Sequence, residues 1–235
     1  MGNTVYYPAE TRGDSNIGWL HGRHSFSIGP FYDPNRMAFG ALKVLNDDIV
    51  QPGTGFGTHG HNNIEIISIP LTGSITHKDD TGKEASISPG EVQVMSAGTG
   101  IRHSEYNDDH FYPINFLQIW ISPGKKDVKP RYQQIRLEPE ENVLQQIVSP
   151  DKDDDGVWIH QEAWLNKGTF TPGEKLNYEL KKSGNGAYIF VISGKLFIAG
   201  QALKDRDAIA ISNTGSIEIS VIERAEFIII DVPMN

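Results

Sequence analysis

The chain has 235 residues, contains no cysteine, and carries 30 Asp and Glu against 21 Lys and Arg, for a formal net charge of −9. The lack of cysteine excludes disulfides and thiolate metal ligands, and the negative charge disfavours direct nucleic-acid binding. No apolar stretch approaches the roughly 20 residues that span a bilayer, and the N-terminus lacks a secretory pattern. We therefore expect a cytoplasmic protein without membrane contact.

Short apolar runs rich in Ile and Val occur along the whole chain. Examples span residues 65–69, 187–192 and 217–222. The turns between such runs draw on 24 glycines and 13 prolines, as in segments 79–82, 88–90, 183–186 and 213–215. This pattern of short strands joined by turns predicts an all-β fold.

Two pairs of potential metal ligands lie in the first half. His59 and His61 are followed, after 41 intervening residues, by His103 and Glu105. Because alternate residues of a strand point to the same face, each pair can aim both side chains into one cavity. Imidazole and carboxylate together suit a divalent first-row metal rather than calcium. The spacing therefore predicts a mononuclear site with three histidines and one glutamate.

Glu65 is a second candidate carboxylate. It follows His61 by four residues and has the same parity as His59 and His61. On an unbroken strand it would face the same cavity. The spacing alone leaves both glutamates open as ligands.

Residues 138–147 are the best candidate for a helix, and we expect them to bridge the two halves of the chain. Pro139 and acidic residues stand near the start, and Pro150 follows the end. Proline and acidic residues are favoured in the first turn of a helix, and proline cannot continue one.

Residues 151–162 satisfy the spacing of an EF-hand calcium loop. A calcium-binding loop of that type needs a helix on each side. Pro150 stops the incoming helix, and residues 157–161 have an extended pattern. We interpret the segment as a solvated acidic turn.

The second half repeats the strand pattern of the first without its ligands. Residues 189–198 echo residues 67–75, and residues 204–211 echo residues 89–94. No histidine follows His160. We therefore expect a metal-free second domain with a structural or lid role.

The residues around the ligand pairs resemble the two cupin motifs. Gly53-x5-His59-x-His61-x3-Glu65-x7-Gly73 is similar to the first motif, and residues 89–105 are similar to the second. Cupins are small jelly-roll β-barrels whose mouths hold metals.

Further segments resemble the pirin family and follow it in order. They are residues 18–20, 24–27, 32–34, 39–42, 46–48, 55–59, 92–98 and 102–105, with a fainter likeness at 149–151, 159–162 and 230–233. The resemblance implies an all-β chain of two cupin barrels with few short helices. An N-terminal metal-binding cupin would span residues 1–135 and a C-terminal metal-free cupin residues 136–235. Gly60, where pirins usually carry proline, and Asn62-Asn63 depart from the family beside the ligands, which affects the expected substrate rather than metal binding.

For bacterial members the resemblance implies a quercetin 2,3-dioxygenase-like enzyme. It favours Glu105 over Glu65 as the fourth ligand and leaves Glu65 a supporting role. Iron(II) is the expected ion, and manganese, copper, nickel and zinc are alternatives because affinity trends do not decide between them. Open coordination positions would let the metal act as a Lewis acid on a small aromatic enol such as a flavonol. We expect Glu105 also to accept the enol proton.

The remaining candidate residues have structural interpretations. His24 is expected to be a hydrogen-bonded structural residue and His77 a turn residue. Possible pocket walls are Phe56, Ile64, Met95 and Phe116.

Two other functions compete with the dioxygenase. Pirin itself is regarded as a nuclear regulator, so the same ligands are compatible with a metal-dependent interaction protein that binds a protein partner. A non-redox enzyme such as a sugar isomerase would favour more basic residues near the metal, and Arg102 is the only such neighbour in the motif.

Overall fold

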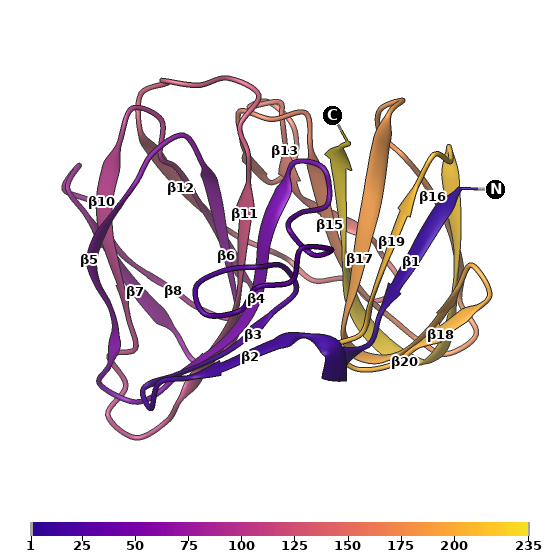
Figure 1. Ribbon diagram of the computed structural model, residues 1–235, viewed down its shortest axis with the longest axis horizontal. Helices are drawn as coiled ribbons and strands as arrows, with labels where there is room; N and C mark the ends of the chain where they lie inside the picture. Colours follow the sequence, from indigo (N-terminus) through magenta and orange to yellow (C-terminus); the bar gives the residue numbers. More distant parts are fainter. Residues whose placement is uncertain (1, 235) are drawn as a thin grey trace.

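The computed structural model describes residues 2–234, which form three β-sheets arranged as two neighbouring barrels (Figure 1). Within these residues the helical content is the short 3-10 helix η1 (Ala9–Thr11). No helix in this part of the chain is long and apolar enough to cross a membrane. The predicted all-β fold is confirmed.

The N-terminal barrel consists of a seven-stranded and a four-stranded sheet that face each other (Figure 1, left). Val50 and Phe116 of the larger sheet share one apolar cluster with Ile75 and Ile87 of the smaller sheet, which closes the barrel. The larger sheet has the order β12 (Arg131–Arg136), β9 (Glu91–Ser96), β6 (Glu65–Thr72), β11 (Ile114–Ile121), β4 (Leu42–Val50), β3 (Leu20–His24) and β2 (Gly13–Asn16). The smaller has the order β5 (Gly55–His61), β10 (Ile101–Tyr106), β7 (Ile75–Asp79) and β8 (Glu84–Ile87).

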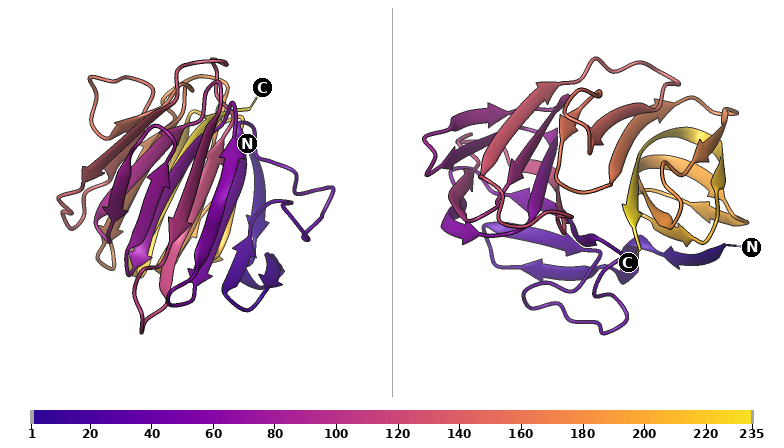
Figure 2. Two further views of the ribbon diagram at one scale, coloured as in Figure 1. Left: turned by 90° about the vertical axis from the view of Figure 1, so that its left-hand side faces the viewer. Right: turned by 90° about the horizontal axis from the view of Figure 1, so that it is seen from above.

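A nine-stranded sheet curls into the C-terminal barrel (Figure 2, right). Its path runs β1 (Asn3–Tyr7), β19 (Ala208–Ser212), β17 (Asn185–Ile198), β20 (Ser216–Pro233), β15 (Trp164–Phe170), β13 (Gln145–Ser149) and β14 (Val157–Trp158), with β16 (Lys175–Glu179) on β20 and β18 (Gln201–Leu203) on β17. Because β1 pairs with β19, the first strand of the chain belongs to the C-terminal sheet. The domain division at residue 135 remains a prediction. β1 lies before that position in the sequence but pairs with a strand of the C-terminal barrel.

The largest apolar cluster lies between the two barrels. Ile67, Leu117 and Ile119 of the seven-stranded sheet are buried with Leu165 and Ile230 of the nine-stranded sheet. Burial of apolar area stabilises by roughly 25 cal/mol per Å². The two barrels therefore hold each other in a fixed arrangement.

The predicted helix over residues 138–147 is wrong, because this segment pairs with the nine-stranded sheet. The backbone N–H of Asn142 donates to Thr169 O at 2.8 Å, and Asn142 has a positive φ of 64°. From Gln145 onward the chain forms β13, in which Ile147 and Val148 are fully buried. Strand pairing and burial outweigh the local helix signals of Pro139 and the acidic residues.

The acidic segment 151–155 forms the connection between strands β13 and β14. Asp154 accepts a hydrogen bond from Ser149 Oγ at 2.8 Å, and the flanking elements are strands rather than helices. The interpretation as an acidic turn is consistent with this arrangement.

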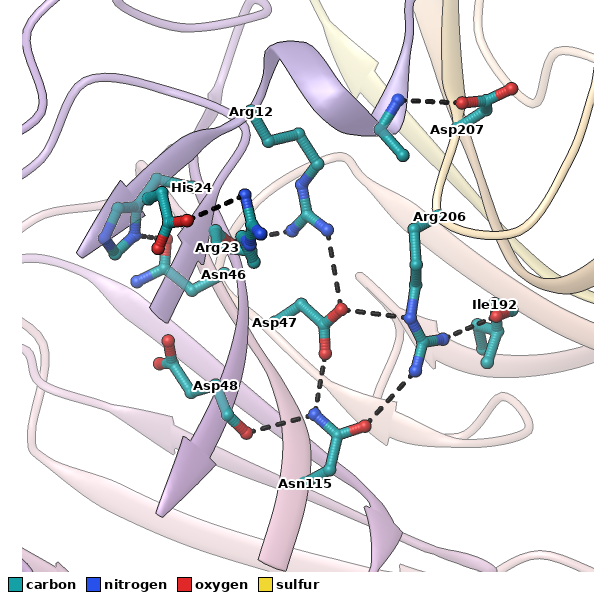
Figure 3. A network of polar contacts seen from close by, with 12 residues as sticks. Arg12, Arg23, His24, Asn46, Asp47, Asp48, Asn115, Ile192, Arg206 and Asp207 are labelled. Atoms are coloured by element: carbon teal, nitrogen blue, oxygen red, sulfur yellow. Dashed lines mark hydrogen bonds and ion pairs between the residues drawn. The ribbon is translucent and has the colours of Figure 1, made fainter. Parts of the chain in front are cut away.

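A network of charged side chains also joins the barrels (Figure 3). Asp47 Oδ2 of β4 forms ion pairs with Arg206 Nε at 3.0 Å and with Arg12 Nη1 at 3.5 Å. Asn115 Nδ2 donates to the other Asp47 oxygen at 2.7 Å, and Arg206 Nη2 donates to Asn115 Oδ1 at 3.2 Å. Arg206 comes from the C-terminal barrel, so one carboxylate connects both halves of the chain.

Candidate metal centre

Strands β5 and β10 bring the three predicted histidines together. The strands are antiparallel neighbours, with His59 directly opposite His103. The ring centroids lie 4.7 Å apart for His59 and His61, 4.5 Å for His59 and His103, and 5.0 Å for His61 and His103. One ring nitrogen of each lies within 4.8 Å of the others. Two segments distant in sequence thus form one nitrogen-rich cluster.

Glu105 follows His103 on the same strand and points deeper into the barrel. Its side chain is buried, and burial raises its pKa to about 7. Ser68 Oγ donates to one carboxylate oxygen at 3.1 Å and Gln118 Nε2 to the other at 2.7 Å. A Glu105 oxygen falls within 4.8 Å of ring nitrogens of His103 and His77. The four predicted ligands therefore occupy two overlapping groups that share His103.

The ring nitrogens of the histidine cluster fit a metal ion. Both ring nitrogens of His103 lack a hydrogen-bond partner. Because the residue is only 2% exposed, solvent does not supply one. An unsatisfied buried polar atom costs about 1–3 kcal/mol, which a bound ion would relieve. His59 Nδ1 lies 2.9 Å from Gly57 O; this nitrogen carries the proton, because a carbonyl only accepts, and Nε2 keeps its lone pair.

The electrostatics favour neutral imidazoles, the form that binds metals. Burial lowers the pKa of His61 to about 4 and that of His103 to about 3, with a further contribution from the neighbouring histidines. At neutral pH both rings are uncharged. The donor set of nitrogen with carboxylate oxygen suits a divalent transition metal.

The cluster is open on one side and walled by aromatic rings on others. His59 and His61 are half-buried, whereas His103 is buried. The Phe56 ring lies 6.3 Å from His59, and the Trp120 ring lies 5.0 Å from His61. Phe56 thus lies where a pocket wall was predicted, and sequence reasoning missed Trp120.

The other predicted wall residues contribute indirectly. Met95 and Phe116 are fully buried core residues. Ile64 and Trp120 both pack against the small cluster that contains Met95. These three side chains support the wall rather than line the cluster.

Glu65 faces the C-terminal barrel instead of the histidines. Its carboxylate accepts a hydrogen bond from Ser96 Oγ at 2.5 Å and another from the backbone N–H of His160, and Arg131 lies nearby. Burial raises the pKa of Glu65, and these contacts oppose the increase. The supporting role expected for Glu65 agrees with this position, because it joins the two barrels.

His77 was predicted to be a turn residue, and this prediction is wrong. It lies in β7 directly opposite Glu105, with no exposed surface. Its Nε2 is 2.9 Å from Asp79 Oδ2. The alternation of Ile75, His77 and Asp79 along β7 was the available signal, since residues two apart share a face.

His24 has the structural role predicted for it. Its Nδ1 lies 2.9 Å from Asn46 Oδ1, and its Nε2 lies 2.7 Å from Ser15 Oγ. Asn46 is in turn opposite Gln118, which is opposite Ser68. A row of buried polar side chains thus crosses the inner face of the seven-stranded sheet and ends at the partners of Glu105.

Comparisons with known proteins cover the whole fold. Residues 7–121 match the Pirin family, and residues 146–232 match the family described as the quercetinase C-terminal cupin domain. The chain is 37% identical over 225 residues to the quercetin 2,3-dioxygenase of Escherichia coli K12, covering 96% of each chain. It is 36% identical over 227 residues to a pirin-like protein of Caulobacter vibrioides, covering 95% of this chain and 97% of that one. The crystal structure of the E. coli bacterial pirin YhhW in complex with nickel(II) superposes with a TM-score of 0.94 at 36% identity, covering 99% and 100% of the two chains.

Proposed function

Because this chain belongs to the pirin family, we propose that it is a metal-dependent dioxygenase that cleaves a flavonol or related aromatic enol with O2. The observation that carries the proposal is the half-open cluster of His59, His61 and His103, in which both His103 nitrogens lack partners. The name of the E. coli relative, quercetin 2,3-dioxygenase, supports the reaction class.

We propose His59, His61, His103 and Glu105 as the metal ligands. The histidines supply neutral nitrogen donors, and Ser68 and Gln118 hold the Glu105 carboxylate in place. A divalent transition metal at this centre would supply Lewis acidity and, with iron(II), redox chemistry toward oxygen. Iron(II) remains the favoured ion; the nickel complex of the E. coli relative makes nickel a direct alternative to test.

The surroundings of the cluster favour a flat aromatic substrate that carries oxygen atoms. Phe56 and Trp120 present ring surface beside His59 and His61. The Trp120 indole N–H is buried without a partner, so it is available to donate a hydrogen bond to a substrate oxygen. We propose Glu105 as the acceptor of the enol proton, and the cytoplasm as the location of the protein.

Oxygen uptake tests the proposal. Protein loaded with iron, manganese, copper or nickel is mixed with quercetin, and uptake is compared with that of the variants His61→Ala and His110→Ala. His110 is exposed and outside the cluster, so His110→Ala controls for loss of a histidine. We expect rapid uptake that is lost in His61→Ala and retained in His110→Ala. No uptake with any metal would refute the enzyme and favour a metal-dependent regulator.

A further inference from the structure

A second group of potential ligand atoms lies next to the histidine cluster and shares His103 with it. His77 of β7 is paired with Glu105 of β10, and His103 lies two residues away on β10. The three residues are 0%, 4% and 2% exposed. One ring nitrogen from each histidine and one carboxylate oxygen lie within 4.8 Å of one another.

The hydrogen bonds of His77 leave one of its nitrogens free. Its Nε2 faces an Asp79 oxygen at 2.9 Å, so Nε2 carries the proton and Nδ1 keeps the lone pair. Asp79 accepts hydrogen bonds from the backbone N–H groups of Thr81 at 2.9 Å and Lys83 at 3.2 Å. Burial raises the pKa of Asp79, but the hydrogen bonds that its carboxylate accepts outweigh this effect and lower the pKa overall. The His77 Nδ1 is buried and has no partner. A carboxylate behind the imidazole is the usual support of a metal-binding histidine.

No hydrogen bond fixes the tautomer of His103, in contrast to those of His59 and His77. His59 is fixed by Gly57 O and His77 by Asp79. Neither nitrogen of His103 has a partner, so either can carry the lone pair. A neutral imidazole has one lone-pair nitrogen at a time. His103 can therefore serve either group of ligands, but not two ions at once.

Glu105 lacks a positive partner. Its two hydrogen-bond donors, Ser68 and Gln118, are neutral, and no ion pair within residues 2–234 includes Glu105. A buried carboxylate is costly unless it is paired with a cation. A divalent ion next to Glu105 would supply that charge.

We propose that His77, His103 and Glu105 form an inner metal position for a divalent transition metal, an alternative to the outer position formed by His59, His61, His103 and Glu105. The inference rests on the proposed function, because both positions lie in the same barrel and share His103 and Glu105. The chain holds one ion, which can occupy either position. Asp79 positions His77 for the inner one.

Cobalt(II) binding to the double variant His59→Ala/His61→Ala tests the inner position. The two substitutions remove the half-buried ligands that belong to the outer position alone and leave the inner three ligands intact. We expect about one cobalt per chain after desalting, with an anomalous diffraction peak between His77, His103 and Glu105. Adding His77→Ala should lower cobalt affinity by at least the roughly 10–100-fold that even a supporting residue contributes.

Thermal unfolding of the metal-free variants establishes that each is folded; if the triple variant is not, His77→Gln replaces His77→Ala. A double variant that binds no cobalt would overturn the inner position. So would a wild-type crystal in which the ion sits only at the outer position while His77 Nδ1 accepts a hydrogen bond from His103, because His77 would then merely orient that ring. Wild-type protein that takes up no oxygen with any metal refutes the dioxygenase alone, since cobalt binding by the double variant does not depend on turnover.

Discussion

Glu65→Gln separates a role in joining the barrels from a role in binding metal. Glutamine keeps one acceptor oxygen but replaces the other with an amide that cannot accept from Ser96 Oγ or the His160 N–H. A hydrogen bond to a charged group contributes about 1.5–3 kcal/mol, so loss of one lowers the free energy of unfolding by about 2 kcal/mol. For a chain of this size, that corresponds to a decrease in Tm of about 4–8 °C.

Two measurements on the same preparation check this expectation. Calorimetry of the metal-free protein gives Tm, and elemental analysis after loading gives the metal content per chain. Glu105→Gln is the matched control, because the same chemical change within the barrel should reduce metal content. Metal content should be unchanged in Glu65→Gln. The reasoning is refuted if Glu65→Gln loses metal while its Tm stays at the wild-type value.

Three further substitutions test other parts of the fold. Asp47→Asn removes the carboxylate beside the buried Arg12 and should lower the free energy of unfolding in urea by about 3–5 kcal/mol; an unchanged midpoint would contradict the network in Figure 3. In metal-free protein, burial raises the pKa of Glu105 to about 7, so the folded state keeps a proton that the unfolded state loses above about 4.5. This contribution to stability is complete below pH 4.5 and is lost as the pH rises through 7. Between these limits the pH slope of the unfolding free energy should therefore differ between wild type and Glu105→Gln by about 1.4 kcal/mol per pH unit, and parallel urea titration series would disprove it. Gly98→Ala adds a Cβ 2.0 Å from Val128 O, whereas Gly90→Ala meets nothing within 4 Å and suffers only from its positive φ of 83°, so Gly98→Ala should lower Tm more; equal Tm values would argue against the close contact.

Local alternation was sufficient to predict the strands and the histidine cluster. His59 and His61 share a face of β5, and His103 and Glu105 share a face of β10. The direct pairing of His59 with His103 then completes the cluster. The spacing of each pair is local in sequence, so it could be recognised before the pairing of the strands was known.

Two predictions failed because strand pairing at long range decides them. His77 is buried by its position opposite Glu105, 28 residues later, and the charged residues that follow it gave the appearance of an exposed turn. Asn142 is held by Thr169, which draws the predicted helix into a strand connection. The alternation of Ile75, His77 and Asp79 could have indicated a strand, but nothing close in sequence identifies Glu105 or Thr169 as the residue opposite.

The orientation of Glu65 shows how a short corner changes the composition of a metal site. Alternation from His61 would place Glu65 on the same face, but β5 ends at His61 and β6 begins at Glu65 in the opposite sheet. Asn63 makes the corner with a positive φ of 48°, which asparagine tolerates, and its side chain is paired with Asp127 at 3.0 and 2.8 Å. Asn62-Asn63, which the sequence comparison connected with substrate identity, thus also marks the point where the face reverses. Since the reversal turns Glu65 toward Ser96 and His160, Glu105 supplies the carboxylate oxygen that lies within 4.8 Å of a ring nitrogen of His103.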